Sequence, residues 1–188
     1  MKASSVDIPG IVVLEPRVFS DDRGSFFESY NRKKAAELGI ADEFVQDNQA
    51  MSRRGVLRGL HYQVKRAQAK LVRVLKGEIF DVAVDLRKSS PTFGKWFGII
   101  LSESNLLQLY LPADFAHGYL VLSERAEVLY KASDFWAPEY ERCILWNDPE
   151  LAISWPIDAQ PVVSAKDARG AFFCQAELPA GTGNGGRE

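Results

Sequence analysis

The chain has 188 residues, 46% of them hydrophobic, and a formal net charge of -2. This length and composition predict one domain with a buried core, and the small charge provides none of the basic field on which nucleic-acid binding depends. The N-terminus lacks an apolar run of signal-peptide length and no later run is long enough to span a bilayer, so we expect a cytoplasmic protein that binds neither nucleic acid nor membrane.

Short strands bounded by turn residues dominate the sequence, a pattern that predicts a β-sandwich or a β-barrel. A strand is expected at residues 10–15, followed by a short helix at residues 32–38 that Asn31 caps and Gly39 ends. The other strand candidates, in chain order, are residues 70–75, 78–86, 96–101, 106–111, 118–122, 126–131 and 144–146. We expect residues 1–178 to form a single β-barrel domain and residues 179–188, which offer no large apolar side chain, to form a flexible tail.

The clearest local prediction is a hairpin, in which Lys76-Gly77 forms the turn between strands 70–75 and 78–86. Side chains along the second strand alternate between two faces. One face carries Phe80, Val82, Val84 and Leu86, and the other carries Asp81, Ala83 and Asp85. The strand therefore has an apolar face and a face with carboxylates.

The two cysteines, Cys143 and Cys174, are too few and too far apart to form a zinc site or a disulfide framework by themselves. We interpret both as ordinary thiols. Cys143 begins an apolar run that ends at Trp146, where a buried structural thiol is more common than a nucleophile.

The two histidines lie in segments rich in glycine and charge, His61 within residues 55–63 and His117 within residues 112–118. In such settings a structural and a functional role are about equally frequent. The paired segments resemble the two motifs of the cupin barrel. Metal-binding cupins usually place a second histidine where this chain has Gln63, and without it a metal ion would have too few strong ligands. We therefore expect a site without a metal.

Several separate motifs, in the same order, resemble the family of dTDP-4-dehydrorhamnose 3,5-epimerases. They are residues 22–28, 55–63, 68–72, 81–85, 90–94, 115–118, 146–149 and 164–167. Together they extend over nearly the whole chain before the tail. The resemblance implies an all-β fold, a cupin-type jelly-roll barrel with a few short peripheral helices.

The resemblance also implies a reaction, the inversion of C3 and C5 of dTDP-4-dehydro-6-deoxy-D-glucose to give dTDP-4-dehydro-L-rhamnose. A hydrogen beside a ketone is weakly acidic, so its removal needs a base, a group that stabilises the enolate, and an acid on the opposite face. By resemblance His61 is the base and Asp167 orients its ring. Lys70 would lie by the keto oxygen, Tyr130 would be the proton donor, and no cofactor would be needed.

The resemblance further implies a set of substrate-binding residues. Arg23 and Glu28 would lie at the thymidine end, Gln46, Asp47 and Asn48 beside the nucleotide, Arg58 on the diphosphate, and His117, Glu141 and Lys166 would complete the site. Phe26, Phe27, Phe135 and Trp136 are all candidates for stacking on the thymine. We also hypothesise that Asp81 pairs with His117 as a second dyad.

Members of the family are homodimers that exchange an N-terminal strand, so Arg23 and Glu28 would serve the neighbouring site. The chain departs from the family pattern at three positions. Asp114 stands where glycine is frequent and Phe135 where tyrosine is common. Asp47 replaces a usual glutamine, and its carboxylate would be unfavourable near a diphosphate unless it faces away.

Three other functions remain open from the sequence. The first is an epimerase that acts on only one of the two carbons, and the second is a cupin enzyme with a metal bound through His61 and His117. The third is a sugar-nucleotide-binding protein without catalysis, although it would leave the joint presence of His61, Lys70, Tyr130 and Asp167 unexplained.

Overall fold

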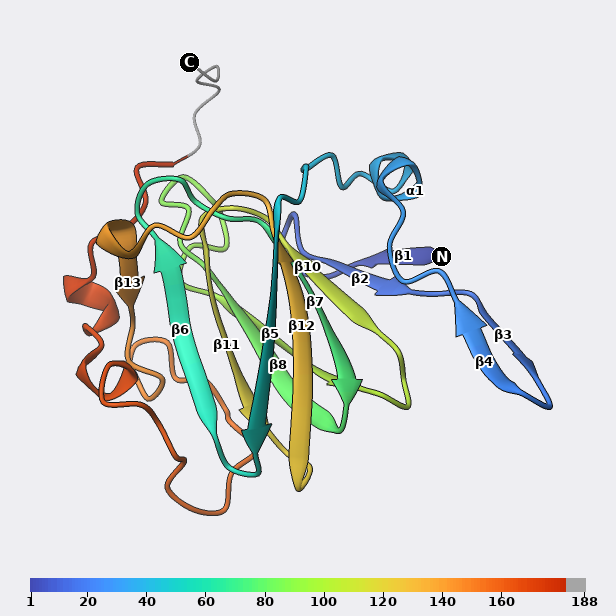
Figure 1. The fold of residues 1–188 in the computed structure, drawn as a ribbon. Helices are drawn as coiled ribbons and strands as arrows, with labels where there is room; N and C mark the ends of the chain where they lie inside the picture. The colour runs from blue at the N-terminus through green and yellow to red at the C-terminus, as the bar shows by residue number, and fades with distance from the viewer. Residues whose placement is uncertain (182–188) are drawn as a thin grey trace.

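The computed structural model describes residues 1–181 and consists mainly of two antiparallel sheets that face each other (Figure 1). The strands of the first sheet are β1 (Lys2–Ser5), β2 (Val12–Glu15), β5 (Gln46–Arg53), β7 (Lys70–Lys76), β10 (Gln108–Leu111) and β12 (Arg125–Ala132). Their order across the sheet is β1-β2-β10-β7-β12-β5. Apart from β1 and β2, neighbours in this sheet come from distant parts of the chain.

The second sheet has five strands in its own order. They are β6 (Leu57–Gln63), β8 (Glu78–Asp85), β9 (Trp96–Ser102), β11 (Phe115–Val121) and β13 (Glu141–Cys143). The order is β13-β6-β11-β8-β9. The two facing sheets confirm the predicted all-β fold of the jelly-roll type.

A separate hairpin, β3 (Val18–Asp21) paired with β4 (Gly24–Phe27), projects away from the barrel (Figure 1). The helix α1 (Arg32–Glu37) follows it and begins as predicted, because the Asn31 side chain accepts a hydrogen bond of 3.2 Å from the Lys34 backbone amide. Three short 3₁₀ helices are η1 (Pro138–Tyr140), η2 (Asp167–Arg169) and η3 (Phe173–Gln175). None of the helices within residues 1–181 is long and apolar enough to cross a membrane.

The side chains on the two faces of β8 pack in different parts of the core, as their alternation along the strand predicts. Ala83 packs between the sheets with residues such as Val72 and Phe115. Val82 and Val84 point to the outside of the second sheet, where the C-terminal segment covers them with Trp155, Phe173 and Leu151. The face with Asp81 therefore points into the barrel, and the apolar face lies outside it beneath the C-terminal segment.

The predicted hairpin of residues 70–86 is wrong. The strands themselves lie where the sequence places them, but β7 pairs with β10 and β12, whereas β8 pairs with β9 and β11. The turn at Gly77 carries the chain from one sheet to the other. Alternation of apolar residues determines which face of a strand is buried, but it does not determine which strand is its neighbour.

The strand predicted at residues 144–146 is also wrong. The actual strand β13 ends at Cys143, and beyond it Ile144 alone continues the pairing, with two backbone hydrogen bonds to Leu60 and an isolated bridge with Ala171. Ile144 is buried beneath the C-terminal segment, so its apolar character reflects this packing, and no strand extends to Trp146. The sequence also failed to predict β1, β3, β4, β5 and β6, most of which are short, exposed or polar on one face.

Two of the motifs behind the resemblance stabilise the fold. In the segment after β8, the buried Asp85 carboxylate accepts hydrogen bonds from Arg87, Ser90 and Thr92 at 2.6–2.8 Å. The buried Asp148 carboxylate accepts bonds from the backbone amides of Leu151 at 2.9 Å and Phe173 at 2.8 Å, which ties η3 to the loop that follows β13. Buried carboxylates need such partners, so both motifs have a structural role.

The expected tail at residues 179–188 begins with Pro179, which is buried. Residues 182–188 lie outside the described part of the chain. The division into a domain and a tail therefore stays a prediction.

Candidate active site

A cleft of about 340 Å³ opens between the two sheets and takes side chains from strands of both. This volume is within the range of small-molecule sites. Eight of the site residues expected from the sequence line it: Gln46, Asn48, Arg58, His61, Lys70, His117, Tyr130 and Glu141. The structure thus gathers residues that are spread over nearly a hundred positions of the sequence.

Close contact between β6 and β11 places the two histidines in this cleft. Gly59 has a φ of +115°, and a Cβ atom there would lie 2.6 Å from both the Gly118 Cα and the His117 carbonyl oxygen. Only glycine permits this approach. The strand register shifts beside it, so that His117 pairs with His61 and Tyr119 pairs with Arg58.

The His61 ring is held by a carboxylate from η2. His61 Nε2 lies 2.7 Å from Asp167 Oδ1, and Asp167 is buried whereas the His61 side chain is 29% exposed. Burial of Asp167 disfavours its charge, but the hydrogen bonds from His61 and from the Gly59 amide outweigh this and hold the pKa of the carboxyl below its usual value. An ionised carboxylate only accepts, so we assign the proton to Nε2 and the free lone pair to Nδ1.

A second histidine and carboxylate pair lies deeper in the barrel. His117 Nε2 is 3.0 Å and 2.9 Å from the two carboxylate oxygens of Asp81, and both residues are buried. Asp81 belongs to the inward face of β8. The pairing hypothesised from the sequence is confirmed.

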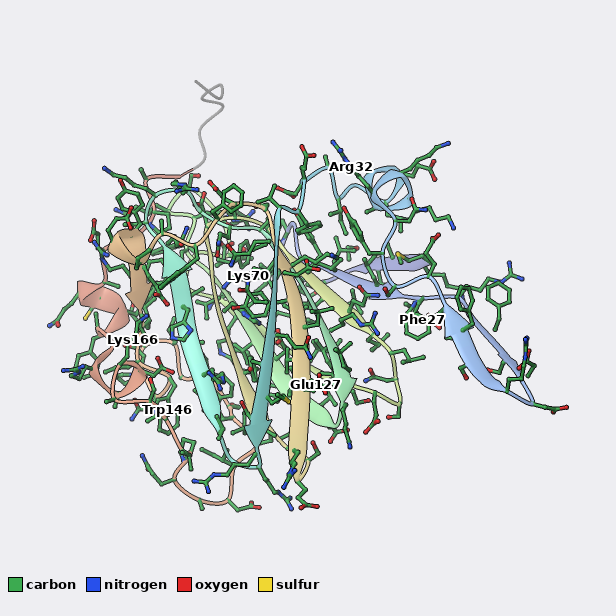
Figure 2. All side chains as sticks on the ribbon, in the orientation of Figure 1. Phe27, Arg32, Lys70, Glu127, Trp146 and Lys166 are labelled. Carbon is green, nitrogen blue, oxygen red and sulfur yellow. The ribbon has the colours of Figure 1, made fainter. Side chains whose placement is uncertain are left out.

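Lys70 and Tyr130 come from the first sheet. Lys70 lies inside the barrel (Figure 2), and its Nζ is 5.8 Å from the centre of the Tyr130 ring. Burial lowers the pKa of Lys70 to about 8, although Asp81 and Glu141 oppose the change. Burial, with a smaller effect of Glu141, raises the pKa of Tyr130, so its hydroxyl remains a proton donor at neutral pH.

Glu141 connects several residues at the rim of the cleft. Its carboxylate accepts a hydrogen bond of 3.0 Å from the Trp136 indole and forms an ion pair of 2.6 Å with Lys166. Gln46 accepts a bond of 3.0 Å from the Trp136 backbone amide. These contacts hold the edge of the indole while the side chain stays largely exposed. Of the four aromatic residues proposed to stack on the base, Trp136 is the one that lines the cleft.

Three residues expected in the site lie elsewhere in this chain. Asp47 alternates to the other face of β5 and forms an ion pair of 2.9 Å with Lys131, so its carboxylate faces away from the cleft. Arg23 is on the projecting hairpin, where it pairs with Asp21. Glu28 follows that hairpin and forms an ion pair of 2.7 Å with Lys34.

Some residues that line the cleft were not among the predicted site residues. Tyr119 lies on the inward face of β11 with His117, and its buried hydroxyl has no hydrogen-bond partner among residues 1–181. The period of two from His117 would have identified it. Gln63 accepts a 2.7 Å bond from the Ala137 amide and donates one of 2.7 Å to the Arg66 carbonyl, so it holds two loops at the mouth. As expected for a position where glycine is frequent, Asp114 has a φ of +67°.

The arrangement of metal-binding side chains differs from the one that a metal-dependent cupin would need. Among residues 1–181, His61, Cys143 and Asp167 form a cluster, which does not include His117. Each histidine is instead bonded to its own carboxylate. Cys143 is half-buried, and burial raises the pKa of its thiol to about 12.

Comparison with known proteins gives consistent results. Residues 5–175 match the family model of dTDP-4-dehydrorhamnose 3,5-epimerase. The dTDP-4-dehydrorhamnose 3,5-epimerase of Pseudomonas aeruginosa is 60% identical over 178 residues, which covers 94% of this chain and 98% of the relative.

Solved structures agree with these matches. A dTDP-6-deoxy-D-glucose-3,5-epimerase of Legionella pneumophila, in complex with dTDP-4-keto-L-rhamnose, has a TM-score of 0.92 and 48% identity, covering 95% of this chain and 97% of that one. A 3'-monoepimerase of Streptomyces bikiniensis in complex with dTDP-quinovose has a TM-score of 0.86 and 33% identity, covering 93% and 91%.

Proposed function

Because the chain belongs to the dTDP-4-dehydrorhamnose 3,5-epimerase family, we propose that it is an isomerase that inverts C3 and C5 of dTDP-4-dehydro-6-deoxy-D-glucose. The product is dTDP-4-dehydro-L-rhamnose. The observation that carries this proposal is that His61, whose ring is bonded to Asp167, lines the same cleft as Lys70 and Tyr130. A proton leaves and returns to carbon while no electron leaves the sugar, so the reaction needs no cofactor.

His61 acts as the base in this proposal. Nδ1 carries the lone pair and accepts the hydrogen from the carbon beside the C4 ketone, which leaves an imidazolium ring. Asp167 stays ionised and stabilises that ring through its 2.7 Å hydrogen bond with Nε2. The buried carboxylate therefore also fixes the ring orientation.

The electron pair left on carbon moves to the keto oxygen and forms an enolate. Lys70 is a buried cation at this cleft, and its ammonium stabilises the developing negative charge. A charge in a buried setting acts more strongly than one in water, because the surroundings screen it less.

Tyr130 returns a proton to the carbon from the other side. It lies on β12 of the first sheet, and His61 lies on β6 of the second sheet, so the two groups flank a sugar held between the sheets. A proton removed on one face and supplied on the other inverts the carbon. Solvent then restores the protonation of Tyr130 and His61. The buried His117–Asp81 pair lies next to Tyr130, with a ring-centre distance of 6.4 Å.

The nucleotide would bind along the rim. Arg58 donates one hydrogen bond of 3.1 Å from Nε to Ser52, which leaves the rest of its guanidinium for the diphosphate. Gln46, Asn48, Glu141 and Lys166 are the polar residues at this end. The indole of Trp136 supplies the face on which the thymine stacks.

We further propose that the enzyme is a homodimer, in which Arg23 and Glu28 complete the site of the partner. The hairpin of β3 and β4 extends away from the barrel of its own chain (Figure 1) and exposes 53% of Phe19 and 74% of Phe26. Exposed aromatic side chains on a projecting element are typical of protein interfaces. The two free thiols support the expected location in the reducing cytoplasm.

The first prediction tests the reaction and its base. In deuterated buffer with a chelator, the protein should incorporate deuterium at both C3 and C5 of dTDP-4-keto-6-deoxyglucose, as measured by NMR. His61→Ala should lose this exchange by on the order of a thousandfold, because no other group replaces the base. Calorimetry should show dTDP binding within about twofold of wild type, since the imidazole is not a phosphate ligand.

The outcomes separate the alternatives. Exchange at only one carbon would identify an epimerase that acts on that carbon alone. Binding of dTDP without exchange would identify a binding protein. Activity lost to the chelator would indicate a metal enzyme. Exchange retained by His61→Ala would rule out the assigned base.

The second prediction concerns pH. The pKa of Lys70 is lowered to about 8, so the ammonium loses its proton as the pH rises through that value, and kcat/KM should fall there. Lys70→Arg keeps a positive charge at all these pH values, so its residual activity should show no decline near pH 8. The same decline in both proteins would assign it to another group.

The third prediction tests the shared site. Arg23→Ala and His61→Ala should each be poorly active, but co-expressed chains should recover about a quarter of wild-type activity, because half of the dimers are mixed and each contains one intact site. The control pair His61→Ala and Lys70→Ala should recover nothing, since both residues come from one chain. No recovery by the first pair would place Arg23 outside the partner's site.

A further inference from the structure

A thiol lies beside the proposed catalytic dyad. Cys143 on β13 is the strand partner of His61 on β6, and the Cys143 Sγ, a His61 ring nitrogen and an Asp167 carboxylate oxygen all lie within 4.8 Å of one another. The thiol donates a weak hydrogen bond of 3.5 Å to the Ile144 carbonyl. The proposed mechanism does not use this group.

The position of the cluster relative to the cleft is informative. His61 lines the cleft, whereas Cys143 and Asp167 do not. Asp167 is bonded to Nε2, and the Cys143 Sγ lies within 4.8 Å of the Asp167 ligand atom, so the cluster gathers around the Nε2 side of the ring and leaves Nδ1 for the substrate. The cluster can take a ligand without occupying the space of the sugar.

The donors match one class of ion. A thiolate, an imidazole nitrogen and a carboxylate oxygen are the ligands that Zn²⁺ takes in proteins, with water in the fourth position of a tetrahedron. The negative charges of the thiolate and the carboxylate balance the two positive charges of the ion. Mg²⁺ and Ca²⁺ prefer oxygen ligands and do not match this set.

We infer that Cys143, Asp167 and His61 Nε2 form an inhibitory site for a thiophilic divalent cation such as Zn²⁺, which switches off the base. The inhibitory part of this inference rests on the proposed role of His61. Without the ion, Nε2 carries the ring proton and Nδ1 carries the lone pair. An ion bound to Nε2 uses the lone pair of that nitrogen, so the neutral ring holds its proton on Nδ1. No lone pair then remains for the carbon-bound hydrogen.

The protons balance in this exchange. The thiol proton leaves to solvent as Sγ binds the ion, and the ring proton moves from Nε2 to Nδ1 by exchange with water. Burial holds the thiol proton firmly, with Asp167 acting in the same direction and Lys166 opposing it. The site is therefore weaker than a dedicated zinc site, and only three of its ligands come from the protein.

The mode of inhibition follows from the geometry. The ion binds at Nε2 and takes no group of the proposed nucleotide site, so it should lower kcat while KM and the affinity for dTDP stay unchanged. A cation that merely chelated the diphosphate of the substrate would instead change the apparent KM. The two effects can be distinguished by steady-state kinetics.

The test uses Co²⁺ as a spectroscopic probe and Zn²⁺ as the inhibitor, with Cys174, the exposed second thiol, as a matched control. Titration of wild type and Cys174→Ser with Co²⁺ should produce the near-ultraviolet absorption of a thiolate–Co²⁺ bond, which Zn²⁺ should abolish. Cys143→Ser should lack this absorption. An absent band in wild type, or an equal band in Cys143→Ser, would overturn the site.

The kinetic part separates the site from the proposed function. Micromolar Zn²⁺ should lower kcat of wild type and Cys174→Ser at least tenfold, reversibly with a chelator, while Cys143→Ser should keep its activity and lose that sensitivity at least tenfold. Equal inhibition of Cys143→Ser would overturn the inference, as would a Co²⁺ band without loss of turnover. A metal-free wild type without turnover would refute the proposed function, while the Co²⁺ band would still report on the site.

Discussion

The hydrogen bond of 2.7 Å between His61 and Asp167 is the contact on which the proposed chemistry depends. It joins strand β6 to a 3₁₀ helix more than a hundred residues later in the chain. The segment that brings Asp167 there is itself held by buried groups, including the Asp148 carboxylate and the apolar residues over the second sheet. The fold therefore fixes the ring nitrogen that carries the lone pair before any substrate binds.

The two facing sheets explain why one small cleft can invert a carbon. The base comes from the second sheet, and Lys70 and Tyr130 come from the first. Burial acts on the latter two in opposite directions, lowering the pKa of Lys70 and raising that of Tyr130. In both cases burial disfavours the charged form, yet Tyr130 keeps its proton at neutral pH and most of the Lys70 side chains keep their charge below pH 8.

The sequence predicted those parts of the fold in which apolar residues alternate, such as β8 and β12, whose predicted ends differ from the observed ends by at most one residue. It missed β5, because alternate residues of this strand face the cleft rather than a core and are polar. Motif resemblance identified the cleft residues, and the confirmed Asp81–His117 pair followed from strand alternation. The same alternation could have predicted that Asp47 points away from the cleft, because its neighbours Gln46 and Asn48 point into it. The sequence could not predict the partners of β7 and β8, because these strands pair with distant segments of the chain. It also could not place Arg23, because its proposed site belongs to a second chain.

Nitrogen-15 NMR of the His61 ring at neutral pH tests the central claim most directly. The chain has only two histidines, so comparison with His61→Ala assigns the signals. The account predicts a neutral ring with a protonated Nε2 and a bare Nδ1, because the Asp167 carboxylate accepts from Nε2. A proton on Nδ1 in the resting enzyme would contradict it, since the ring would then have no lone pair facing the cleft.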